Sequence, residues 1–227
     1  MTNPDAPSGS GRGTNPGSLA RTSTDTLRPI ENFKIGLHGT WASLPLRPEG
    51  DDWPAVVAAS LCDDEAAAKL LAARLNMAHP DLITPEHVGL AVWVPDRVDG
   101  EIRGFLSVDW MTPDSSGLHG RDYYLELISK TKRPRVTVLA QRVDKIELPA
   151  GPAVRERERI SLASGRLFSR REVVQDNVLY TVFPADSGDA LQLTFSTDTL
   201  DHADALTDEA DGLAPTLEIV LGQPDEP

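Results

Sequence analysis

The feature that most constrains the fold is the C-terminal stretch 136–222, where short segments of strand-like residues alternate with turn signals. Strands are predicted at 136–142, 155–159, 178–183, 191–195 and 216–220, because β-branched, aromatic or charged residues recur there with strand-like spacing. Arg and Glu alternate from Arg155 to Arg159, which we interpret as cross-strand pairing on a solvated sheet face. A helical pattern over 201–213 precedes the last strand. This part of the chain is therefore predicted to form a meander of strands closed by one helix and one strand.

The N-terminal half adds helices and a hairpin. Ordered structure is predicted to begin with an alternating segment at 32–37, and helices to start near 51–54 and 63–65, the second ending at Pro80. Strands over 88–94 and 102–110 flank the turn signal Asp99-Gly100, and a short helix is expected over 123–129. We expect an α+β fold with a mainly antiparallel sheet covered by helices. The predicted divisions are a disordered tail over 1–29, one domain over 30–222 and a short tail over 223–227.

Composition restricts the kinds of molecule that the protein is expected to bind and its expected cellular location. The 227 residues carry a net charge of −13, which argues against nucleic acid and anionic membranes as partners. Cys62 is the only cysteine, so no intrachain disulfide can form, and its apolar surroundings predict a buried thiol. Residues 1–28 lack the apolar core of a secretory signal, and no later stretch approaches a membrane span. The expected location is the cytoplasm.

Part of the chain resembles a known superfamily. The residues that carry the likeness are the turn and strand 148–155, the strands 178–183 and 191–197, the helix 201–213 and the strand 216–220. In this order they resemble the PsbP-like superfamily, which includes a Ran-binding nuclear transport factor, lipoproteins of the LpqN type and small bacterial chaperones. The resemblance covers about residues 31–222. It implies an α/β/α sandwich used for protein binding, and it carries over no catalytic residue.

The sequence contains no clear catalytic or metal-binding motif. The five histidines lack the His-x-x-x-His spacing of metal sites, and Asp201-His202 is better interpreted as a helix start. The acidic runs 51–52 and 63–65 have a sufficient role at helix N-termini, and no Gly-x-Ser-x-Gly elbow is present. The sequence therefore predicts no catalytic, cofactor-binding or metal-binding residue.

Two basic groups stand out against the acidic background. Lys132 and Arg133 follow the helix over 123–129, where positive side chains favour a helix C-terminus. Arg166, Arg170 and Arg171 surround Phe168 in a segment that is either an exposed hairpin or a surface docking an acidic partner, with Phe168 as its anchor. These six residues are the predicted partner-binding surface.

The remaining candidates are aromatic. The four tryptophans, including Trp110, are predicted to be core rather than ligand-stacking residues. Trp93 lies in the most apolar strand, whereas Trp41 and Trp53 flank a proline-rich loop and could line a groove. The functional hypothesis is a non-enzymatic protein-binding module, such as a chaperone, adaptor or accessory factor for another, possibly secreted, protein. An enzyme or small-ligand-binding protein with a site built from distant residues is the first alternative. A structural subunit of a larger assembly is the second.

Overall fold

The computed structural model describes residues 27–223 except 83, 86, 113–119, 132, 134–135 and 165–170, and omits the side chains of Asp81, Ala163, Ser164 and Arg171. The strands are β1 (Ile30–Lys34), β2 (Trp41–Ser43), β3 (His87–Trp93), β4 (Gly104–Met111), β5 (Val136–Leu148), β6 (Gly151–Ser164), β7 (Arg171–Val182), β8 (Ala190–Thr197) and β9 (Glu218–Leu221). The helices are α1 (Trp53–Leu61), α2 (Glu65–Leu82), α3 (Arg121–Lys130) and α4 (Ala203–Leu213), and the 3-10 turns are η1 (Leu200–His202) and η2 (Ala214–Thr216).

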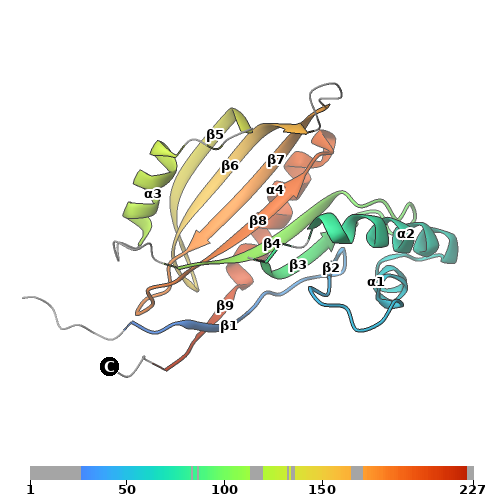
Figure 1. The fold of residues 1–227 in the computed structure, drawn as a ribbon, viewed down its shortest axis with the longest axis horizontal. Coiled ribbons are helices and arrows are strands. Elements are labelled where there is room, and N and C mark those ends of the chain that lie inside the picture. Colours follow the sequence, from blue (N-terminus) through green and yellow to red (C-terminus); the bar gives the residue numbers. More distant parts are fainter. Residues whose placement is uncertain are drawn as a thin grey trace, which may run out of the picture.

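Seven strands form one antiparallel sheet in the order β2-β3-β4-β8-β7-β6-β5. The separate strands β1 and β9 pair with each other (Figure 1). The predicted α+β class with an antiparallel sheet is confirmed. Among the described elements, β5 is one edge of the large sheet and the short β2 is the other.

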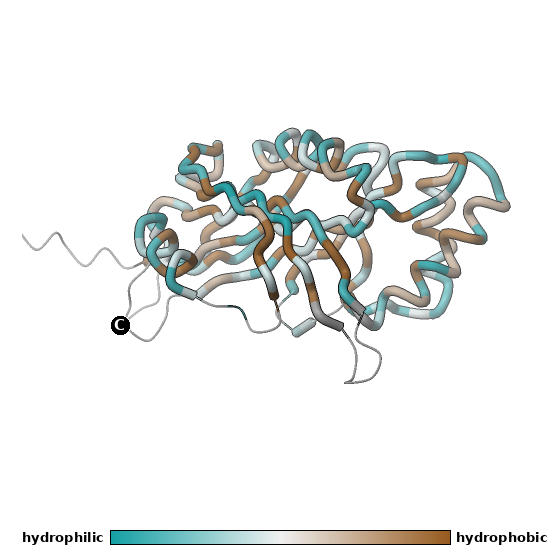
Figure 2. Tube along the Cα trace, turned by 90° about the horizontal axis from the view of Figure 1, so that it is seen from above, coloured by the Kyte–Doolittle hydropathy of each residue, from teal (hydrophilic) through white to brown (hydrophobic). Residues whose placement is uncertain are grey.

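The two faces of the sheet pack against different helices. Side chains such as Trp93, Phe195 and Leu206 form one core cluster beneath α4. Their neighbours along the strands, including Leu90 and Val92, point the opposite way and pack against α1 and α2. Helix α3 lies on that second face, at the β5 end of the sheet (Figures 1 and 2). The arrangement has helices on both sides of the strands.

Several local predictions match the structure closely. Strands β3 and β4 pair as expected around the loop that contains Gly100, which has a positive φ of 60°. An added Cβ at Gly100 would lie 2.8 Å from the Ala67 carbonyl oxygen, so a side chain there is excluded. Two predictions need correction: Pro80 lies inside α2 rather than at its end, and Trp110 is exposed rather than core.

Contrary to the prediction from the sequence, the Arg–Glu alternation over 155–159 does not lie on a solvated sheet face. Arg155 and Arg157 point toward α4, where they bind Asp211 and Asp204. Glu156 and Glu158 point to the opposite face and are 5% and 1% exposed. Because successive strand residues face opposite sides, the alternation separates the two charges onto two faces, and the Glu face is buried.

Candidate functional site

A cavity of about 600 Å³ lies between α3 and the sheet, and it is the largest of three described cavities, the others measuring about 360 and 220 Å³. Its apolar lining comprises Met111, Leu127, Ile128, Val136, Val138 and Leu179. Its polar lining comprises Tyr124, Ser129, Thr131, Arg133, Gln141, Glu156 and Gln192. Small-molecule sites in proteins have this size and this mixture of apolar walls and few polar groups.

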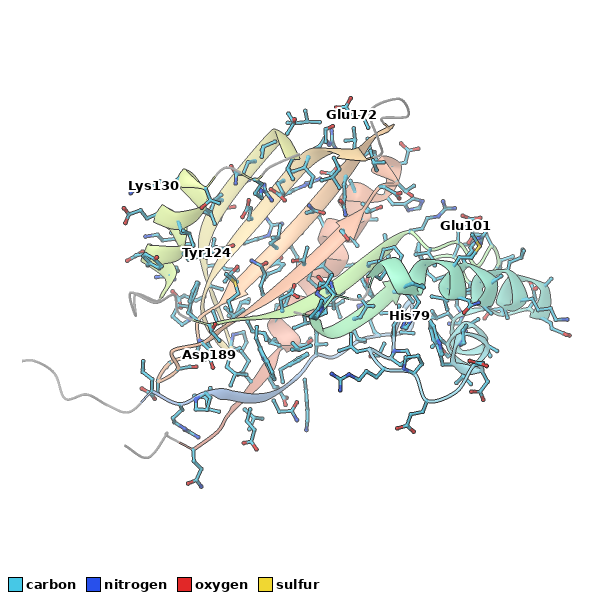
Figure 3. The ribbon with its side chains drawn as sticks, in the orientation of Figure 1. His79, Glu101, Tyr124, Lys130, Glu172 and Asp189 are labelled. Atoms are coloured by element: carbon cyan, nitrogen blue, oxygen red, sulfur yellow. The ribbon has the colours of Figure 1, made fainter. Side chains whose placement is uncertain are left out.

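Helix α3 is held over the sheet by one buried side chain and by polar contacts near its start. Tyr124 is the buried residue of α3 and projects toward the strands (Figure 3). Near the N-terminus of the helix, Arg121 Nη1 lies 2.5 Å from Glu147 Oε1, and Lys145 Nζ lies 2.7 Å from Asp122 Oδ1. Leu127 of α3 remains 43% exposed. Because Tyr124 is the buried residue of α3, the helix covers the cavity without filling the space beneath it.

Tyr124 meets an amide at the floor of the cavity. Its hydroxyl oxygen accepts a hydrogen bond from Gln192 Nε2 at 3.0 Å, and the same nitrogen lies 2.9 Å from Thr181 Oγ1. Burial raises the pKa of the Tyr124 hydroxyl, which therefore stays protonated. This end of the cavity presents neutral hydrogen-bonding groups.

The other polar region of the cavity contains Arg133 and Glu156, and the buried Glu158 lies beside it. Arg133 donates from Nη1 to Glu158 Oε1 at 2.8 Å and from Nη2 to Glu158 Oε2, and Asn177 Nδ2 donates to the same carboxylate at 3.1 Å. Burial alone would raise the pKa of Glu158, but these hydrogen bonds outweigh it and lower that pKa. Glu158 is therefore an ionised, paired carboxylate.

Glu156, two residues earlier, has a different environment. Its Oε1 accepts a hydrogen bond from Gln141 Nε2 at 2.6 Å, and no Lys or Arg forms an ion pair with it among the residues that the structure describes. Burial raises the pKa of this carboxyl, and the nearby Glu158 acts in the same direction. Glu156 is the ionisable group of the cavity that lacks a cationic partner of its own.

Of the predicted partner-binding residues, the structure places Arg133 at the cavity, paired with Glu158 and 39% exposed. Lys132, Arg166, Phe168 and Arg170 lie outside the described residues, as does the side chain of Arg171. Their role stays a prediction. Glu156, Gln141 and Tyr124 were not proposed as site residues, and in the sequence they carry no signal beyond strand and helix periodicity.

The other candidate residues from the sequence analysis pack against neighbouring side chains and form no site within the described residues. Cys62 is buried and free, and burial raises its pKa. Trp41 does not line a groove, because it is buried and stacks on Trp93 with ring centroids 6.1 Å apart. His202 packs edge-on against Trp93. In the described part of the chain no group of three or more His, Cys, Asp or Glu could hold a metal ion.

Comparison with known proteins identifies similar solved structures but no family. No family model and no curated protein matches the sequence. The crystal structure of LpqN, involved in cell envelope biogenesis of Mycobacterium tuberculosis, is similar over 83% of each chain, with 12% identity and a TM-score of 0.37. This is a weak, fold-level likeness, and membership of the PsbP-like superfamily stays a prediction. No helix in the described residues is long and apolar enough to cross a membrane.

Proposed function

We propose that this protein is a non-enzymatic binding protein whose cavity beneath α3 holds a small amphipathic ligand. The observation that carries this proposal is the cavity itself. A volume of about 600 Å³ separates α3 from the sheet, although helices and sheets in proteins normally pack in close contact. The cavity walls combine apolar side chains with hydrogen-bonding groups that come both from the helix side, such as Tyr124 and Arg133, and from the sheet, such as Glu156. Binding is favoured over catalysis because Arg133 and Glu158 are committed to each other rather than directed at a substrate.

Filling the cavity tests the proposal. Ile128 lines the cavity from α3, so Ile128→Trp should occupy part of it and weaken the binding of a neutral apolar dye such as Nile red at least about tenfold. Val56→Trp, at an exposed position of α1, should leave binding unchanged. Fluorescence titration measures both. Equal dye affinity in the wild type and Ile128→Trp, with both folded, would show that the cavity is not the binding site.

A second candidate function is binding of a protein partner, the adaptor hypothesis. The specific observation is a group of exposed apolar side chains, Val138, Leu139 and Val173, at one end of the sheet. Val138 pairs with Ile160 and Val173 with Leu162, so they lie near the ends of β6 and β7 that segment 165–170 connects. Arg166, Arg170 and Arg171 belong to the same stretch of sequence. The partner that complements this end is a protein surface combining acidic and apolar residues.

This second candidate has its own experiment. We expect affinity purification to recover one stoichiometric partner that is lost from both Phe168→Ala/Arg170→Glu and Val173→Asp. The exposed-site control Val220→Asp should retain it. Binding of the identified partner is then measured with purified proteins. A partner that binds all three variants equally, or the absence of a partner for a folded bait, would contradict the adaptor hypothesis.

A further inference from the structure

In the described part of the chain, two buried carboxyls on the cavity side of the sheet share a single cation. On the cavity side of β6 lie two buried carboxyls, Glu156 and Glu158, and within the described residues Arg133 is the cation paired with either of them. Arg133 directs both terminal nitrogens to Glu158. Glu156 accepts a hydrogen bond from the neutral amide of Gln141, and its carboxyl also hydrogen-bonds to that of Glu158. A buried carboxylate requires a cation or a proton to compensate its charge, and this one has no side-chain cation of its own.

One unpartnered acceptor lies on the same face of the sheet, beside the cavity lining. Asn177 donates its amide nitrogen to Glu158, while its Oδ1 is buried and has no partner among the described groups. The adjoining walls are apolar, with Ile128 on α3, Val138 on β5 and Leu179 on β7. An occupant that complements both the Glu156 carboxyl and the apolar walls needs a positively charged donor at one end and a hydrocarbon body at the other.

We infer that the cavity binds an amphiphile with a protonated amine, whose ammonium group meets the Glu156 carboxylate while its alkyl part lies against Ile128, Val138 and Leu179. This inference rests on the proposed function, because it names the ligand class of the same cavity. An ammonium supplies three donors and a positive charge together, and charge-assisted hydrogen bonds to a carboxylate are the strong ones.

The alternative head groups are less suited to this geometry. A carboxylate or phosphate head would place another anion beside Glu156 and Glu158, with the guanidinium of Arg133 already engaged. A neutral alcohol could fill the apolar space and donate one hydrogen bond, but it brings no positive charge to Glu156. The expected order of affinity is therefore ammonium, then alcohol, then carboxylate.

Isothermal titration calorimetry with octylammonium, 1-octanol and octanoate tests this order on the full-length protein. The wild type should bind octylammonium about tenfold more tightly than 1-octanol, and octanoate least. Glu156→Gln keeps the side-chain shape and the hydrogen bond to Gln141, so it should bind 1-octanol as the wild type does and lose the preference for the amine. The matched control Glu218→Gln removes one exposed carboxylate from β9 and should retain the preference.

The outcomes separate the two proposals. Equal affinity for octylammonium and 1-octanol in the wild type, or a preference that survives in Glu156→Gln, would overturn the ligand class and leave the cavity as a binding site. If none of the three probes binds the wild type, the proposed function fails, and the ligand class fails with it. Circular dichroism of each variant shows that the fold is retained in the comparison.

Discussion

Glu156 and Glu158 share one face of β6, yet their pKa values move in opposite directions. Burial raises the pKa of Glu156, whereas hydrogen bonds from Arg133 and Asn177 overcome burial and lower that of Glu158. The titratable groups that face Glu156 are Glu158, Arg133 and Tyr124, and burial keeps the Tyr124 hydroxyl protonated. The two carboxyls are only two positions apart on β6, and the contact of Glu158 with Arg133 makes it the one that ionises more readily.

The raised pKa of Glu156 predicts a pH-dependent stability. A carboxyl whose folded pKa exceeds its unfolded pKa contributes stability below the unfolded value, near pH 4, and loses it as pH rises through the folded value. Glu156→Gln cannot ionise, so it should match the wild type near pH 4 and become more stable than the wild type at about pH 8. Urea unfolding across this range measures the difference.

Glu218→Gln, on exposed β9, is the control and should show no such pH-dependent gain. A Glu156→Gln variant that is less stable than the wild type at about pH 8 would contradict the prediction. It would mean that Arg133 stabilises the charge of Glu156 as well as that of Glu158.

At the scale of elements, α4 anchors one face of the sheet through apolar packing and ion pairs. Leu206 is buried, and an added Cβ at Gly104 of β4 would lie 3.1 Å from Leu206 Cδ1. Arg155 of β6 reaches Asp211 of α4 with Nε–Oδ1 and Nη2–Oδ2 distances of 2.8 and 3.0 Å. The helix is thus fitted to the sheet at both its apolar and its polar positions.

We expect Leu206→Ala to lower the free energy of unfolding by about 2–5 kcal/mol, because the truncated side chain leaves a cavity beneath α4. Leu200→Ala, at a half-exposed position of η1, should change it by no more than about 0.5 kcal/mol. Urea denaturation followed by circular dichroism compares the two. Similar losses in both variants would show that α4 does not pack against β4 as described.

At the scale of the whole molecule, the first and last described strands join. Arg28 donates from Nε to the Gly222 carbonyl oxygen at 2.7 Å and from Nη2 to the Leu221 carbonyl oxygen at 2.9 Å. Its backbone also bridges to Ser187. Strands were predicted at 32–37 and 216–220, but their pairing was not, because period-two patterns identify strands and do not identify partners.

The sequence by itself determined the element types and much of their order, since these follow from local periodicity and turn residues such as Asp99-Gly100. It also identified Trp93 as core. Only the tertiary structure decided that Glu156 and Glu158 are buried while Arg155 and Arg157 reach α4, because an alternating strand is the same in sequence whichever face is covered. The cavity likewise depends on how α3 lies across strands distant in the chain. Burial, and with it the charge state of Glu156, is a property of that packing and not of any local pattern.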